Sequence, residues 1–143
     1  PRPAPDPTAP ATVGARVTIT HSPDAPRANA LRAELRFPGQ FSFNDVAPNV
    51  DAAALAALIA LLRARCGHAR IAVTGHTCNR GLPDVNLAVG RARAESVAEL
   101  LAAAGVDPSR LDIRSAGSRE PTTSNRTSEG RSANRRVVIA CQP

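Results

Sequence analysis

The amino-acid sequence predicts an α/β protein, a two-layer sandwich in which helices cover one face of a mixed β-sheet. Residues 55–62 and 97–104 carry apolar side chains at i, i+3, i+4 and i+7, the spacing of one helical face. The short apolar stretch Ile71–Thr74 lies between them and has the length and composition of a strand. Strands that alternate with helices are typical of a sheet covered by its own helices.

The N-terminal region differs in composition from the rest of the chain. Pro1–Pro10 reads PRPAPDPTAP, which predicts an extended tether over residues 1–12. The same composition is typical of a frayed terminus, so both interpretations stand. Partly alternating apolar and polar side chains in Val13–Thr20 and Leu31–Phe37 predict two strands. We therefore expect an N-terminal hairpin or edge-strand extension over residues 13–40.

The main domain is expected over residues 41–143, and it opens with a short strand at Phe41–Phe43. Asn49 or Asp51 can cap the first helix, and Gly67 is a stop signal for it. The remaining predicted elements are a strand at Ile71–Thr74, a helix from Asp84 to Ala104, a strand at Leu111–Ser115, a polar loop from Gly117 to Asn134 and a strand at Val137–Cys141.

The charge of the chain narrows the choice of partners. The 143 residues carry a net charge of +6, and every basic residue other than His is Arg. A basic surface attracts nucleic acid, anionic lipid or an anionic cell wall. Nucleic acid fits poorly, because single-strand binding uses stacking aromatic side chains and this chain has no Trp or Tyr.

No apolar run approaches the roughly 20 residues of a membrane span. The chain starts with Pro and has no Met, so we expect a mature or excised fragment.

Two polar side chains fall on the apolar face of the second predicted helix. At helical spacing, Asn86 and Arg93 lie in the arc that Val97 and Leu101 define. Burying an unpaired guanidinium is costly, so Arg93 needs an acidic partner, an open pocket or a stem that extends to solvent. The loop before this helix follows the carboxyl end of a strand, where α/β sheets commonly bind ligands.

Several motifs occur along the chain in a fixed order. They are Phe41-Ser42-Phe43-Asn44, Gly75-His76-Thr77, Gly81, Asn86, Val89-Gly90, Arg93-Ala94, Val97, Leu101, Asn125, Thr127, Gly130-Arg131 and Asn134-Arg135-Arg136-Val137. Together they resemble the OmpA-like peptidoglycan-binding domain over about Phe41–Ile139. The resemblance implies a βαβαββ core that binds peptidoglycan non-covalently and catalyses no reaction. It also implies a periplasmic protein, held at the outer membrane through a region outside this chain.

The same resemblance implies the ligand and the residues that hold it. The ligand is the diaminopimelate of the stem peptide, whose free end is a zwitterion. Arg93 matches the Arg that pairs with its carboxylate, and Arg135 matches an Arg that lines the site; guanidinium groups suit bidentate contacts with a carboxylate. Asn44, Thr77 and Asn86 match supporting positions.

The chain departs from the family at Cys78, where the family has the Asp that receives the ligand's ammonium. A neutral thiol does not balance an ammonium as a carboxylate does. Three outcomes stay open: Asp45 or Asp84 supplies the missing charge, thiolate character of Cys78 serves in part, or binding is weakened, lost or redirected to another ligand. The alternative function is therefore a domain of this fold that has lost diaminopimelate binding and acts as a structural or protein-interaction module in an envelope complex.

Three cysteines leave at least one thiol without a partner in the chain. Ile71–Gly75 alone separates Cys66 from Cys78 by about 16 Å, at roughly 3.3 Å per residue, whereas a disulfide needs Cα atoms within about 7 Å. If Asn134–Arg136 lie at the pocket, the last strand leads from there toward the end where Cys66 lies. We therefore predict a Cys66–Cys141 disulfide, which suits an oxidising periplasm.

Metal binding and catalysis are weaker interpretations of the same residues. Cys66, His68, His76 and Cys78 form a C-x-H…H-x-C pattern that is compatible with zinc, but a straight strand holds its two halves apart. Cys78 near His76 suggests a nucleophile and a base, but side chains two positions apart on a loop tend to diverge, and no third orienting residue is evident. We therefore expect no metal, no cofactor and no enzymatic activity.

Overall fold

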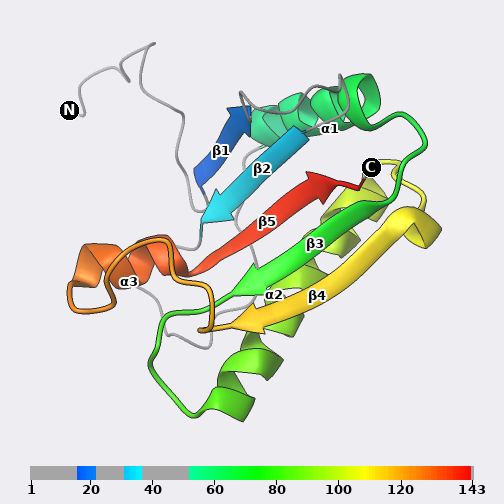
Figure 1. The fold of residues 1–143 in the computed structure, drawn as a ribbon. Coiled ribbons are helices and arrows are strands. Elements are labelled where there is room, and N and C mark those ends of the chain that lie inside the picture. Colours follow the sequence, from blue (N-terminus) through cyan, green and yellow to red (C-terminus); the bar gives the residue numbers. More distant parts are fainter. Residues whose placement is uncertain (1–15, 22–30, 37–51, 143) are drawn as a thin grey trace, which may run out of the picture.

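The computed structural model describes residues 16–21, 31–36 and 52–142. The elements in chain order are β1 (Arg16–His21), β2 (Leu31–Arg36), α1 (Ala52–Cys66), β3 (Ile71–His76), α2 (Pro83–Ala103), the short 3₁₀ helix η1 (Pro108–Arg110), β4 (Leu111–Gly117), α3 (Ser128–Asn134) and β5 (Arg136–Cys141) (Figure 1). The predicted features that lie outside the described residues are the tether, the strand at Phe41–Phe43, the caps Asn49 and Asp51, and the site residues Asn44 and Asp45.

The described strands form one mixed sheet of five strands in the order β1-β2-β5-β3-β4. β3 and β4 are parallel, whereas β1–β2, β2–β5 and β3–β5 are antiparallel. The predicted mixed sheet with extra N-terminal strands is confirmed, since β1 and β2 occupy one edge. The division of the chain at residues 13 and 41 stays a prediction.

Helices α1 and α2 pack against the same face of the sheet (Figure 1). Alternate residues of each central strand point to that face, so Ile71 and Val73 of β3 and Val137 and Ile139 of β5 are buried under the helices. The core they share with the helices is aliphatic and also contains Ala33, Leu58, Ile59, Leu62, Cys66, Ala94, Val97, Leu101 and Val106. The two-layer α/β sandwich is therefore confirmed.

The carboxyl half of β3 lies in direct backbone contact with α2. A Cβ atom on Gly75 would overlap the carbonyl oxygen of Gly90, and a Cβ atom on Gly90 would crowd the Oγ of Ser115 and the carbonyl oxygen of Gly75, so both positions require Gly. Ser115 of β4 adds a hydrogen bond to the helix backbone, since its Oγ donates to the carbonyl oxygen of Leu87 at 2.7 Å. These contacts fix the end of β3 against the buried face of α2, which carries Arg93.

The prediction that Gly117–Asn134 is a polar loop is wrong in part, because α3 occupies its last seven residues. Thr127 caps this helix: its hydroxyl oxygen accepts a hydrogen bond from the amide of Gly130 at 2.9 Å. A helix this short has no apolar stripe to reveal it. It lies beyond the end of the sheet, directly before β5 (Figure 1).

Candidate functional site

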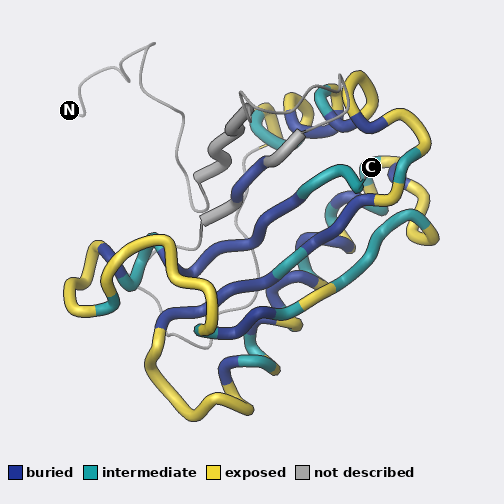
Figure 2. The backbone as a smooth tube through the Cα atoms, in the orientation of Figure 1, coloured by how far each residue is buried: buried dark blue, intermediate teal, exposed yellow. Residues whose placement is uncertain are grey.

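The site residues predicted after β3 lie at the boundary between the core and the solvent. Thr77 and Cys78 are buried, whereas the loop Asn79–Leu82 and the first three residues of α2 are exposed (Figure 2). The amide of Thr77 donates to the carbonyl oxygen of Gly117 at 2.8 Å, and its hydroxyl donates to that of Cys78 at 2.9 Å. Both donors of Thr77 are therefore used within the chain.

Arg93 and Asn86 point inward from α2, as helical periodicity predicted. Arg93 is 0% exposed, and its Nη1 donates to the carbonyl oxygen of His76 at 3.2 Å. Asn86 is 3% exposed, and its Nδ2 lies 3.4 Å from the carbonyl oxygen of Gly81. Arg93 thus reaches the end of β3, while Asn86 contacts the backbone of the exposed loop.

Arg135 brings a second guanidinium to this place from the other end of the chain. It follows the last residue of α3 and is 6% exposed. Its Nη1 donates to the Sγ of Cys78 at 3.4 Å across 57 residues of sequence. Cys78 is 1% exposed and is the one free cysteine of the described chain. Within the described residues, Nε of Arg135 is buried and has no hydrogen-bond partner.

The structure therefore gathers four of the six predicted ligand-binding residues, Thr77, Cys78, Arg93 and Arg135, at the carboxyl end of β3. Asn86 of α2 contacts the backbone of the neighbouring loop, and Asn44 is outside the described residues. Asp84, which the sequence offered as a substitute acid, is exposed in the first turn of α2.

Sequence reasoning did not identify the residue that positions Arg135. Asn134 is 0% exposed and ties the segment before α3 to the end of that helix. Its Oδ1 accepts from the amides of Thr122 at 2.8 Å and Thr123 at 3.3 Å. Its Nδ2 donates to the carbonyl oxygen of Thr123 at 2.9 Å and to the Oδ1 of Asn125 at 2.8 Å. The position of Asn134 immediately before Arg135 in a motif was the available signal.

We expect the substitution Asn134→Ala to lower the free energy of unfolding by about 2 kcal/mol, because it leaves two backbone amides without their acceptor. Urea denaturation followed by circular dichroism measures this change. The exposed Asn79→Ala is the matched control and is expected to leave stability within about 0.5 kcal/mol of wild type. Equal effects of the two substitutions would show that the Asn134 contacts do not hold this segment.

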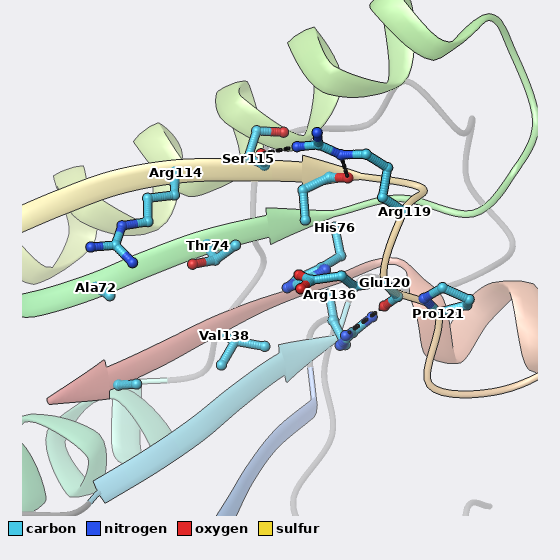
Figure 3. A pocket seen from close by; sticks show the side chains of 12 residues that line it. Ala72, Thr74, His76, Arg114, Ser115, Arg119, Glu120, Pro121, Arg136 and Val138 are labelled. Atoms are coloured by element: carbon cyan, nitrogen blue, oxygen red, sulfur yellow. Dashed lines mark hydrogen bonds between the residues drawn. The ribbon is translucent and has the colours of Figure 1, made fainter. Parts of the chain in front are cut away.

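The face of the sheet opposite α1 and α2 carries a separate open cavity of about 810 Å³ (Figure 3). Arg136 lies at its wall and is 2% exposed. Nη2 of Arg136 donates to the backbone carbonyl of Glu120 at 3.0 Å, and its Nε lies 3.9 Å from Oε1 of Glu34. Arg119 also lines the cavity, but it donates to the carbonyl oxygens of Ala116 and Ser115. These contacts give both Arg side chains partners within the chain.

The predicted disulfide between Cys66 and Cys141 is confirmed, with Cα atoms 5.5 Å apart. It joins the end of α1 to the end of β5 and takes Cys66 out of the C-x-H…H-x-C pattern. In the part of the chain that the structure describes, no group of three or more His, Cys, Asp or Glu side chains could hold a metal ion. None of the described helices is both long and apolar enough to span a membrane.

The chain matches the OmpA family over residues 43–135 and belongs to it. This family comprises OmpA-like domains that bind or associate with peptidoglycan. YiaD from Escherichia coli (strain K12) is 32% identical over 132 residues, which cover 91% of this chain and 57% of YiaD. The peptidoglycan-binding protein ArfA from Mycobacterium tuberculosis (strain ATCC 25618 / H37Rv) is 40% identical over 74 residues, which cover 52% of this chain and 23% of ArfA.

A solved structure shows the same architecture. The crystal structure of the peptidoglycan-associated lipoprotein from Burkholderia pseudomallei is 25% identical and has a TM-score of 0.66. The match covers 76% of this chain and 89% of that one. The chain thus spans nearly the whole of a solved domain, but only about half of YiaD and a quarter of ArfA.

Proposed function

We propose that this domain binds peptidoglycan non-covalently and anchors an envelope protein to the cell wall. The observation that carries the proposal is the position of Arg93, whose side chain is 0% exposed and reaches the carboxyl end of β3. Arg135 contacts the neighbouring Cys78. Two guanidiniums in one buried place suit a ligand with a carboxylate. Membership of a peptidoglycan-binding family, and the similarity to ArfA, support the same class of ligand.

The ligand that we propose is the diaminopimelate of the stem peptide. Arg93 holds its carboxylate, and Arg135 lines the same site. Thr77 and Asn86 keep the connection after β3 in place through their backbone contacts, and Asn44 is proposed as a further supporting residue. The domain catalyses no reaction in this proposal, because its role is to hold the wall.

We also propose where the domain works. An oxidising periplasm suits the Cys66–Cys141 disulfide, and outer-membrane attachment through a region outside this chain suits a wall anchor. In this arrangement residues 1–12 are the tether, residues 13–40 the edge-strand extension and residues 41–143 the binding domain.

The second candidate function is a structural or protein-interaction module of the same fold that no longer binds diaminopimelate. The contact between Arg135 and Cys78 favours this second function, because the thiol of Cys78 supplies no carboxylate to balance the ammonium of diaminopimelate. Exposed Leu82 and Val85, at 71% and 41%, lie on the adjoining loop and first turn of α2 and offer apolar contacts.

Co-sedimentation with purified diaminopimelate-type sacculi tests the proposal. We expect the wild-type domain to pellet and Arg93→Ala to lose binding at least tenfold, because the carboxylate loses its charged partner. Arg91→Ala is the matched control, since Arg91 is exposed on the same helix and pairs with Glu95 on the surface. It is expected to pellet like wild type.

The folded state of each variant is checked by circular dichroism before sedimentation. A wild-type domain that stays in the supernatant contradicts the proposed function. If Cys78→Asp then pellets, the pocket is intact and the second candidate function is favoured. A folded Arg93→Ala that pellets as well as wild type would remove Arg93 from the site.

A further inference from the structure

The cavity on the face of the sheet opposite α1 and α2 has a flat floor of small side chains. The strand register places Ala72 of β3 beside Ala140 of β5, and Thr74 of β3 beside Val138 of β5. All four residues line the cavity, which has a volume of about 810 Å³ (Figure 3). Pockets that hold small ligands have volumes of roughly 300–1,000 Å³. The cavity is therefore large enough for a small ligand that lies flat on this floor.

Hydrogen-bonding groups that the fold leaves unused line the same cavity. Within the described residues, no hydrogen bond or ion pair uses the hydroxyl of Thr74 or the carboxylate of Glu120. Arg119 uses Nε and Nη2 for backbone carbonyl oxygens, and its Nη1 has no partner in the same part of the chain. A hydroxyl donates and accepts, a carboxylate accepts and a guanidinium donates. The cavity thus presents both donors and acceptors to a ligand.

The formal charges at the cavity balance. Three Arg side chains line it, and each has one acid beside it: Asp112 beside Arg114, Glu34 beside Arg136, and Glu120 next to Arg119 in the sequence. The whole chain, in contrast, has a net charge of +6. Complementary charge is what steers a charged partner to a surface. A neutral, polar ligand therefore fits this cavity better than an anion or a cation.

The cavity adjoins the proposed peptidoglycan site at the carboxyl end of β3. The backbone carbonyl of His76 accepts a hydrogen bond from Arg93 at that site, whereas the side chain of His76 lines the cavity (Figure 3). Arg135 contacts Cys78, and the next residue, Arg136, lines the cavity. The two places are therefore neighbours in the structure, and one polymer that carries a peptide and a second chemical group can contact both.

We infer that the cavity binds the sugar chain of the wall polymer, a neutral glycan of N-acetylated amino sugars. The inference rests on the proposed function and adds a second contact to it. The apolar face of a sugar ring packs on the floor at Ala72 and Val138, and its hydroxyl and acetamido groups form hydrogen bonds with Thr74, Glu120 and Arg119. An extended peptide fits less well, because β3 and β5 are paired on both edges and offer it no free backbone groups.

The probe for this inference is chitotetraose, a neutral oligomer of N-acetylglucosamine that carries no stem peptide. Titration into the isotopically labelled wild-type protein is expected to give saturable shifts of the backbone amide NMR signals of the residues that line the cavity. Thr74→Val keeps the shape of the side chain and is expected to weaken binding about fivefold, because a ligand hydroxyl loses its partner. Thr123→Val is the matched control, since Thr123 is exposed and lies outside the cavity lining. It is expected to bind like wild type.

A second pair of variants removes the same charge at two places. Glu120→Ala is expected to weaken the binding of chitotetraose about fivefold, because the ligand loses an acceptor. Glu99→Ala is its control, since Glu99 is exposed on α2, which covers the other face of the sheet. This control changes the net charge by the same amount and is expected to leave binding unchanged.

Several results overturn the inference: no saturable shifts, shifts away from the cavity, equal or tighter binding of cationic chitosan or anionic galacturonate oligomers, or shifts at the cavity from a stem tripeptide alone. Arg93→Ala is expected to keep chitotetraose binding, because Arg93 belongs to the other site. The two proposals are thereby tested separately. Sacculi that pellet the domain while chitotetraose gives no shifts contradict the glycan site alone, and the opposite result contradicts the proposed function alone.

Discussion

The substitution Gly75→Ala is expected to lower the free energy of unfolding by roughly 3–5 kcal/mol, the upper range for a single change. The new Cβ would overlap the carbonyl oxygen of Gly90, which is backbone and cannot turn away as a side chain can. Relief requires β3 and α2 to separate, and this removes the packing of Val73 and Val97 in the core they share.

Urea denaturation followed by circular dichroism measures the loss. Gly67→Ala is the matched control, because Gly67 has a φ of +54° and no atom within 4 Å of an added Cβ. Its expected cost is only the roughly 1–2 kcal/mol of a left-handed backbone. If Gly75→Ala costs no more than Gly67→Ala, the strand and the helix separate easily and the close approach is not a constraint.

Loss of the Cys66–Cys141 disulfide has the second large expected effect. The bond closes a loop with a sequence separation of 75, and chain-entropy reasoning gives a stabilisation of about 4 kcal/mol for a loop of this length. The double substitution Cys66→Ser and Cys141→Ser is expected to lose about this amount in a urea titration.

A reductant provides the matched control. Addition of dithiothreitol is expected to destabilise wild type and Cys78→Ser equally, because Cys78 is free, and to leave the double variant unchanged. Non-reducing peptide mapping that recovers Cys78 in a bridge would contradict this assignment. Equal stability of the oxidised and reduced wild type would show that the bond adds nothing to the folded state.

The parts of the fold that follow from local periodicity could be predicted from the sequence. The apolar spacing around Leu58 and Val97 predicted both long helices, and Gly67 and Gly105 have the positive φ expected of residues that end them. The same periodicity placed Asn86 and Arg93 on the inner face of α2, where both are buried.

The features that could not be predicted from the sequence depend on contacts between distant segments. Helix α3 is held by the Thr127 cap and by the side chain of Asn134, not by an apolar stripe. The approach of Arg135 to Cys78 joins residues 57 apart. The motif resemblance placed both residues in one site, but it matched Cys78 to a position that receives an ammonium.

The place of β5 in the sheet bears on the order in which the molecule assembles. β5 is the last strand along the chain, yet it lies between β2 and β3 and is the only described link between β1–β2 and β3–β4. During synthesis or export, the earlier strands would wait as two separate ribbons with unpaired edges until residues 136–141 arrive. The complete sheet therefore forms only after nearly the whole domain has emerged. A chain interrupted before residue 136 leaves β2 and β3 each with an unpaired edge, which is open to recognition by the quality-control machinery and to pairing with other interrupted chains.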